Sequence, residues 1–222
     1  MTAARYQKIQ AVLAKRQADL TIFAEHIHKP HNLSAMLRSC DAVGIGTVYA
    51  FNPTGGVPTY NETSASANKW INLQVYERTR DVLEILRAQN MQILATRVSD
   101  SAVNYLEVDY TVPTCIVMGN ERDGISDEVA EAADQHIIVP MVGMVQSLNV
   151  SVATAVILFE AQRQRRAKGM YDRPRLSAQD RAAQTFKWLY SKQAARLDEA
   201  GLPYPELDDD GYIIKSSAVT AS

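Results

Sequence analysis

The segment from residue 137 to residue 169 restricts the possible folds of this chain more than any other stretch. Ile137 to Val139 is typical of a short buried strand, which Pro140 ends because proline has no backbone N–H to pair with a neighbouring strand. After an uncharged loop, a long helix is predicted from Asn149 to Gly169, a residue suited to the left-handed position that ends helices. The first half of this helix carries apolar side chains on all sides: Val150, Val152, Ala153, Ala155, Val156, Ile157, Leu158, Phe159 and Ala161. Such a helix must be covered on several sides, so we expect this loop and helix at the centre of the molecule or of an assembly.

The rest of the chain alternates short uncharged strands with helices. Strands are predicted at residues 20–27, 47–51, 92–96 and 115–118, and helices at residues 6–16, 32–42, 81–89 and 126–133. Asn32 is the predicted N-cap of the second helix, which Gly44 ends, and Ser126 is the predicted N-cap of the fourth. This order indicates an α/β fold with a mostly parallel sheet and helices on both faces.

Three loops of this sheet are candidates for a functional site. They follow the strands that end at Ile27, Met118 and Val139, and they are the richest in Asn, Ser, Gly, Glu and Arg. Ligands of open parallel sheets bind in the loops beyond the carboxyl ends of the strands. We therefore expect these loops to form a site.

The length of 222 residues and the hydrophobic content of 46% fit one large domain with helical extensions. Residues 1–18 are predicted to be an N-terminal helical extension, and residues 19–168 the α/β domain. Residues 169–222 are predicted to be a basic helical extension that ends in an acidic, partly flexible tail.

The cellular compartment follows from what the sequence lacks. Cys40 and Cys115 lie far apart in apolar surroundings, which indicates reduced core thiols. The N-terminus has no apolar segment of a secretory signal, and no apolar run approaches the ~20 residues of a membrane-spanning helix. We expect a soluble cytoplasmic protein with no membrane partner.

Charge is distributed unevenly along the chain, although the net charge is only −2. Residues 162–196 carry ten Lys or Arg and two Asp, a net charge of +8, with Phe186, Trp188 and Tyr190 among them. Clustered charge is usually a solvated helix face, but few acidic residues lie nearby to pair with these cations. Aromatic side chains among cations favour RNA over a small metabolite.

Several other patterns carry little weight. His26, His28 and His31 have no acid or cysteine at a spacing that would complete a zinc site, so we expect no metal. No dinucleotide fingerprint and no Walker sequence is present. Residues 119–124 can be a simple turn, or Glu121 can accept a hydrogen bond from a ribose or an amine. Ser147 lacks the nucleophile elbow of a hydrolase and can simply cap the long helix with Asn149.

Three motifs in the order of a known family are present. They are Asn32-Leu-Ser-Ala-Met-Leu-Arg38, Ile116-Val-Met-Gly-Asn-Glu-Arg-Asp-Gly124 and Val139-Pro-Met-Val-Gly-Met-Val-Gln-Ser-Leu-Asn-Val-Ser151. Residues 28–32, 160–165 and 169–174 also match. From about Arg5 to Pro174, the chain resembles the SPOUT superfamily of S-adenosylmethionine-dependent RNA methyltransferases. Within it, the chain is most similar to the TrmH (SpoU) tRNA guanosine-2′-O-methyltransferases.

This resemblance implies a fold that the hydrophobic pattern of the sequence alone does not predict. Residues 19–168 would form an α/β-knot in which the last strand, loop and helix make a deep trefoil knot, although knots are nearly absent among proteins. The resemblance also implies an obligate homodimer whose site takes residues from both chains. An apolar helix after Asn149 is consistent with such burial.

The implied reaction is S-adenosylmethionine-dependent 2′-O-methylation of a guanosine ribose in tRNA, at position 18 of the D-loop. The short N-terminal helix, with no separate RNA-binding domain before it, favours tRNA over ribosomal RNA. No metal is required, because the leaving group departs neutral. A 2′-O-methyltransferase acting on ribosomal RNA and a non-catalytic RNA-binding protein on the same fold are the alternatives.

The resemblance also assigns residues. Arg38 would be catalytic and placed by Asn32, with Glu121, Ser147 and Asn149 completing the site. The residues expected to line the cofactor pocket are Thr96, Gly119, Val139, Met141 and Leu148. The residues expected to hold RNA phosphates are Lys8, His31, Arg163, Arg165 and Arg173.

Arg38 allows two versions of proton removal. Such an arginine is often described as the general base, yet guanidinium groups effectively never lose their proton in proteins. Either a substrate phosphate and a dry site force that loss, or Arg38 stays charged and binds the phosphate beside the target ribose. In the second version another group accepts the proton.

Overall fold

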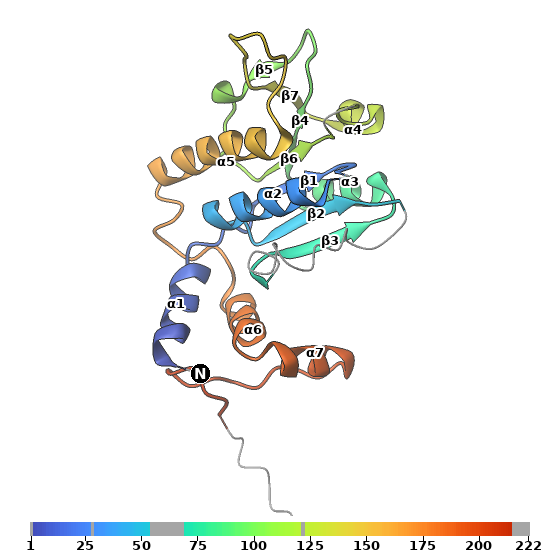
Figure 1. Cartoon of the computed structure of the whole chain (residues 1–222). Helices are drawn as coiled ribbons and strands as arrows, with labels where there is room; N and C mark the ends of the chain where they lie inside the picture. Colours follow the sequence, from blue (N-terminus) through green and yellow to red (C-terminus); the bar gives the residue numbers. More distant parts are fainter. Residues whose placement is uncertain (1, 28, 54–68, 121–122, 215–222) are drawn as a thin grey trace, which may run out of the picture. The chain divides into compact units, whose positions relative to one another are not determined.

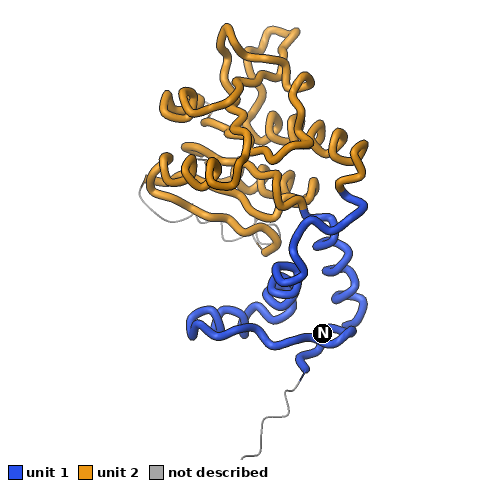
Figure 2. Tube along the Cα trace, turned by 180° about the vertical axis from the view of Figure 1, so that it is seen from behind, with its two compact units in different colours: residues 1–16, 171–222 blue, residues 17–170 orange. Residues whose placement is uncertain are grey.

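The computed structural model describes residues 2–27, 29–53, 69–120 and 123–214. The chain forms two compact units (Figure 2): residues 17–170 make the larger one, and residues 1–16 and 171–222 make the smaller one. The N-terminal and C-terminal extensions, predicted as separate segments, therefore belong to one unit.

The larger unit is built on a seven-stranded parallel sheet of order β3-β2-β1-β6-β4-β7-β5 (Figure 1). Its strands are β1 (Leu20–Ala24), β2 (Thr47–Phe51), β3 (Asn72–Tyr76), β4 (Gln92–Thr96), β5 (Val103–Asn104), β6 (Thr114–Met118) and β7 (Gln135–Ile138). Every strand pair between neighbours is parallel. The α/β fold with a mostly parallel sheet is confirmed, and the trefoil knot stays a prediction.

Helices cover both faces of this sheet. On one face, α2 (Pro30–Val43) and α5 (Val150–Ala167) bury Met36 and Ile157 in a core cluster with strand residues such as Ile116. On the other face, α3 (Thr79–Ala88) and α4 (Asp127–Ala132) pack on alternate strand residues such as Val117. Alternate residues of β6 therefore face different helical layers, which explains why this central strand is buried along its whole length.

Helix α2 begins earlier than predicted. Pro30 is its first residue and Lys29 its N-cap, without a side-chain hydrogen bond. Proline suits this position because its fixed φ is helical and its missing N–H has no partner there in any case. The prediction that Asn32 is the N-cap is therefore wrong. Gly44 ends the helix as predicted, with φ of 89°.

Helix α5 begins as predicted. Asn149 is its N-cap, and the side chain of Asn149 accepts a hydrogen bond from the backbone N–H of Ser151. Two apolar side chains of this helix are nevertheless half exposed in the single chain, Val152 at 48% and Phe159 at 50%. The sheet and α2 bury the other side of α5. The apolar side chains on all sides of this helix predict burial on every side, and the described part of the single chain buries only part of it.

The smaller unit consists of α1 (Ala3–Leu13), α6 (Ala178–Leu189), α7 (Ser191–Glu199) and the segment after α7. Gln10 on α1 donates to the Thr185 hydroxyl on α6 at 2.8 Å. Phe186 and Trp188 are buried within this unit, and the ring of Phe186 stacks on Tyr204 with centroids 4.9 Å apart. The helical extension predicted after residue 168 thus contains two helices, α6 with Phe186 and Trp188, and α7. Across the part of the chain that the structure describes, no helix is long and apolar enough to cross a membrane.

Candidate functional site

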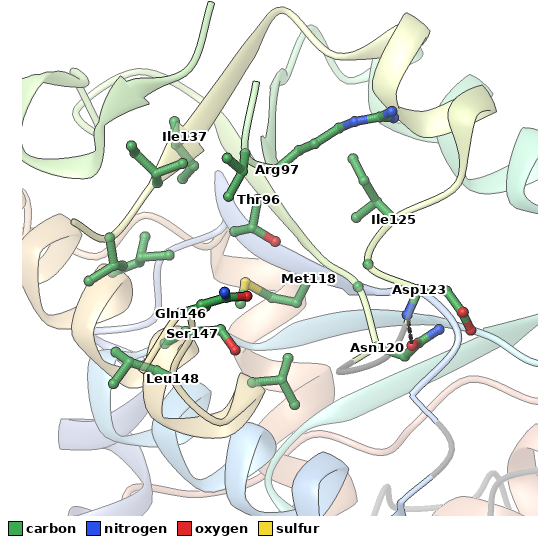
Figure 3. Close-up of a pocket in the computed structure, with 18 of the residues that line it drawn as sticks. Thr96, Arg97, Met118, Asn120, Asp123, Ile125, Ile137, Gln146, Ser147 and Leu148 are labelled. Carbon is green, nitrogen blue, oxygen red and sulfur yellow. Dashed lines mark hydrogen bonds between the residues drawn. The ribbon is translucent and has the colours of Figure 1, made fainter. Parts of the chain in front are cut away.

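A pocket of about 620 Å³ lies at the carboxyl ends of β4, β6 and β7 (Figure 3). Its size is within the range of small-molecule sites in proteins. The structure brings together in its lining all five residues that the sequence assigned to a cofactor pocket: Thr96, Gly119, Val139, Met141 and Leu148. Two of the three loops predicted to form a site, those after Met118 and Val139, line it, whereas the described residues of the loop after Ile27 do not.

Both apolar and polar side chains line the pocket. Met118, Ile137 and Ile157 contribute apolar surface from β6, β7 and α5. Gln146 and Ser147 come from the uncharged loop before α5 (Figure 3). A site of this composition suits a ligand with an aromatic or apolar body and a few polar groups at defined positions.

The loop after β6 turns tightly at the edge of the pocket. The backbone N–H groups of Asn120 and Gly124 each donate to the carbonyl oxygen of the other, at 3.0 and 3.1 Å. The Asn120 side chain also accepts from the backbone N–H of Asp123 at 2.7 Å. A Cβ atom at Gly119 would overlap the carbonyl group of Gly124 and the backbone nitrogen of Ile125, so only glycine fits there. Glu121, which the sequence assigned to the catalytic site, lies outside the described residues.

Two other predicted site residues meet at the start of α5. The Asn149 amide nitrogen donates to the Asn32 side-chain oxygen at 3.2 Å. Asn32 is buried in the first turn of α2, and Asn149 caps α5, so this bond fixes the starts of both helices relative to each other. Ser147, two residues before this cap, lines the pocket.

Arg38 lies apart from these residues. It is exposed on α2, does not line the pocket, and makes no hydrogen bond or ion pair with any residue that the structure describes. Six residues separate it from Asn32, and at 3.6 residues per turn the two side chains leave α2 on different faces. Within one chain, therefore, Asn32 does not hold Arg38 by direct contact.

The sequence as a whole matches a known family of RNA methylases. The model of the SpoU rRNA Methylase family matches residues 19–159, and that of its C-terminal part (SpoU, rRNA methylase, C-terminal) matches residues 163–216. The chain belongs to the SpoU rRNA methylase family.

Relatives and solved structures of the SpoU family agree with this assignment. The tRNA (guanosine(18)-2′-O)-methyltransferase of Thermus thermophilus is 51% identical over 188 residues, which are 85% of this chain and 97% of that protein. The crystal structure of the Aquifex aeolicus TrmH/SpoU tRNA modifying enzyme has a TM-score of 0.80 and 44% identity, over 85% of this chain and 96% of that one. The AdoMet-bound rRNA methyltransferase of Sinorhizobium meliloti has a TM-score of 0.59 and 26% identity, over 69% of this chain and 59% of that one.

Four of the five cations that the sequence assigned to RNA are exposed in this SpoU family chain. Lys8 and Arg173 belong to the smaller unit, and His31 and Arg163 to the larger one. Arg163 pairs with Glu160 at 2.7 Å on α5, and this hydrogen bond lowers the pKa of the Glu160 carboxyl. The Arg163 side chain is still 68% exposed, so a phosphate can reach it.

Arg165 corrects the sequence prediction. Its side chain is 0% exposed, and its Nη1 contacts the Asp19 carboxylate at 2.6 Å. The remaining hydrogen bonds of its guanidinium group go to the Gln17 side chain and to the carbonyl oxygens of Asp19, Tyr110 and Val112. All five N–H donors are thus engaged inside the protein. Arg165 stabilises the larger unit and does not bind an RNA phosphate.

We expect Arg165→Met to lower the free energy of unfolding by about 3 kcal/mol, because the Asp19 carboxylate and three carbonyl groups lose their partner. Arg163→Met is the matched control on the same helix, and we expect it to leave the free energy of unfolding nearly unchanged, because an exposed ion pair contributes little. Urea denaturation of both variants measures the difference. Equal midpoints for the two variants would contradict the structural assignment of Arg165.

Within the described residues, no group of three or more His, Cys, Asp or Glu side chains could hold a metal ion. His26 instead packs edge-on against Phe51, with ring centroids 4.4 Å apart.

Proposed function

We propose that this chain is an S-adenosylmethionine-dependent tRNA 2′-O-methyltransferase that modifies guanosine at position 18 of the D-loop. The observation that carries the proposal is the 51% identity over 97% of the length of a relative named for this activity. The pocket supports it as well, since its lining includes all five residues that the family resemblance assigned to the cofactor.

The lining of the pocket fits S-adenosylmethionine. The AdoMet-bound methyltransferase of similar fold supports this ligand. Thr96, Gly119, Val139, Met141 and Leu148 would hold it, and the absence of a side chain at Gly119 keeps the two ends of the loop after β6 close together. When bound, S-adenosylmethionine supplies a methyl group on a sulfonium centre that leaves as a neutral thioether.

The protein contributes mainly position and charge. The hydrogen bond between Asn32 and Asn149 fixes the start of α5 behind the loop that carries Ser147. Aligning two reactants in this way is worth up to ~7–11 kcal/mol in well-ordered systems. Arg38 would act at the ribose that receives the methyl group, either by holding the adjacent phosphate while charged or by removing the 2′-hydroxyl proton.

We also propose that the enzyme is a homodimer in the cytoplasm. Arg38 does not reach the pocket of its own chain, so a second chain is needed to bring such a residue to the site. Several apolar side chains are exposed in the loop before α5 and on α5 itself: Val142, Met144, Val145, Val152 and Phe159. Contiguous exposed apolar surface typically marks a protein interface. Sedimentation equilibrium tests the dimer, and a monomer at micromolar concentration would contradict it.

The reaction is tested by incubating the purified protein with methyl-labelled S-adenosylmethionine and three RNAs. These are a tRNA transcript, the same transcript with position 18 changed from G to A, and ribosomal RNA. We expect label only in the first, recovered as 2′-O-methylguanosine. Label in ribosomal RNA alone would favour the rRNA methyltransferase, and RNA binding without cofactor affinity would favour a non-catalytic protein.

We expect the double variant Arg163→Ala/Arg173→Ala to bind tRNA with a weaker salt dependence. Each lost phosphate contact reduces the slope of log K against log salt by ~0.7–0.9, so the pair should reduce it by about 1.4–1.8. The control is Arg78→Ala/Arg80→Ala, two cations at the start of α3 that are 77% exposed and also paired with neighbouring acids. If the slope of log K against log salt is the same in both double variants, Arg163 and Arg173 do not contact RNA phosphates.

A further inference from the structure

One buried acid, Glu25, contacts residues that line the pocket and pairs with no cationic side chain of the described part of the chain. Glu25 follows β1 directly and is 0% exposed. Its carboxylate accepts three hydrogen bonds: from the Ser126 hydroxyl at 2.7 Å, from the Ser126 backbone N–H at 2.8 Å and from the Thr79 hydroxyl at 3.2 Å. Among the residues that the structure describes, no Lys, Arg or His pairs with it. A buried carboxylate is costly unless its oxygens are fully hydrogen-bonded, so this arrangement calls for an explanation.

The donors around Glu25 stabilise a negative charge. Thr79 is the first residue of α3, and Ser126 is the N-cap of α4. Carboxylates are favoured near helix starts, where backbone N–H groups lack partners within the helix. The Ser126 hydroxyl, while donating to Glu25, accepts from the backbone N–H of Val129 at 3.2 Å. Glu25 therefore belongs to the network that fixes where α4 begins.

Glu25 contacts both ends of the pocket loop. Its backbone N–H donates to the carbonyl oxygen of Met118 at 2.9 Å, directly before Gly119. Its carboxylate holds Ser126, directly after Ile125. Met118, Gly119, Gly124, Ile125 and Ser126 all line the pocket, whereas Glu25 does not. Glu25 thus contacts the residue directly before this loop, Met118, and the residue directly after it, Ser126.

We propose that Glu25 is a positioning residue for the cofactor pocket, and that its carboxylate sets the affinity for S-adenosylmethionine without touching it. This inference rests on the proposed function, because it assumes that the pocket lined by Gly119, Gly124, Ile125 and Ser126 holds that molecule. The backbone N–H of Glu25 contacts Met118, and its carboxylate contacts Ser126. A substitution of the side chain therefore removes only the contact with Ser126. The loop should then stay attached at Met118 and lose its defined position at Ile125 and Ser126.

The test is Glu25→Gln, which keeps the shape of the side chain and replaces one acceptor oxygen by an NH₂ donor. At least one of the three donors then loses its acceptor, which typically costs enough to change an equilibrium about 10-fold or more. We expect the Kd for S-adenosylmethionine, measured by calorimetry, and the KM for it to rise about 10-fold. We expect kcat at saturating cofactor and the Kd for tRNA to stay within about 3-fold of the wild type.

The matched control is Thr21→Val on the same strand. Thr21 is buried like Glu25, and its hydroxyl donates to the carbonyl oxygen of Thr47 at 2.8 Å, at the opposite end of β1 from the pocket. This variant also loses a buried hydrogen bond, so we expect reduced stability with an unchanged Kd for S-adenosylmethionine. An equal cofactor Kd in Glu25→Gln and Thr21→Val would overturn the proposal and leave Glu25 a merely structural residue.

A second variant keeps the test decisive if Glu25→Gln does not fold. Thr79→Val removes one of the three donors and does not alter the pocket lining. We expect a rise of about 3-fold in the Kd for S-adenosylmethionine, and no rise would count against Glu25. A wild-type protein that fails to bind S-adenosylmethionine would instead contradict the proposed function, so the two failures are distinguishable.

Discussion

Replacing Arg38 by alanine is expected to reduce methyl transfer to tRNA by about 100- to 1000-fold, because a positioned charge at the reacting group contributes that much to catalysis. The Kd for S-adenosylmethionine should not change. Arg38 is exposed on α2, lies outside the pocket lining and makes no hydrogen bond with the described part of the chain, so its loss leaves the pocket intact. Single-turnover rates with labelled cofactor, together with calorimetry, measure the two quantities separately.

Arg80→Ala is the control for Arg38→Ala, since Arg80 is a similarly exposed helical arginine on α3 that is not assigned to the site. Its rate should equal that of the wild type. An Arg38→Ala enzyme with nearly full activity would rule out a catalytic contribution from this residue. Weakened cofactor binding would instead place Arg38 in the pocket.

Arg38→Lys distinguishes the two versions of the chemistry. Lysine keeps the positive charge but loses the planar fork that binds a phosphate through two N–H groups. Appreciable activity would favour the charged, phosphate-holding role. A rate as low as that of Arg38→Ala would have two explanations: phosphate binding needs the planar guanidinium group, or the arginine itself removes the proton. The pH dependence of the rate separates these two.

Much of the sheet could be predicted because its strands are short, apolar runs between polar loops. The bounds of β2 and β4 agree with the predicted strands at residues 47–51 and 92–96. The edge strands β3 and β5 were missed because their residues are only partly buried, and β5 has only two residues. A partly exposed strand carries too little apolar pattern to be distinguished from a loop.

The site was predictable where a loop sequence determines its own geometry. Ser126 and Asn149 are caps, and caps are recognised from residues a few positions away. Glu25 and Arg165 were not recognised, because their partners lie far along the chain: 101 residues separate Glu25 from Ser126, and 146 separate Arg165 from Asp19. The spacing of residues in the sequence does not distinguish a buried arginine with five hydrogen-bond acceptors from a solvated one. A run of basic residues therefore overestimates how many cations are exposed to RNA.

Gly119→Ala is expected to weaken binding of S-adenosylmethionine at least about 100-fold and to lower the free energy of unfolding by about 1–3 kcal/mol. The added methyl group would overlap the carbonyl group of Gly124 and the backbone nitrogen of Ile125. Both are backbone groups, so no side chain can rotate away, and carbon atoms need about 3.5–4.0 Å between centres. The loop must therefore open, and Gly124, Ile125 and Ser126 would move out of the pocket lining.

Gly143→Ala is the matched control, because it lies in the uncharged loop before α5 and a Cβ atom there meets nothing within 4 Å. We expect its cofactor Kd to be within about 2-fold of the wild type and its midpoint of urea denaturation to be unchanged. Calorimetry on the folded variants compares the two substitutions directly. If Gly119→Ala binds the cofactor as well as Gly143→Ala does, the tight turn after β6 is not needed for the pocket, and the contacts that Glu25 makes with this loop would lose their proposed function as well.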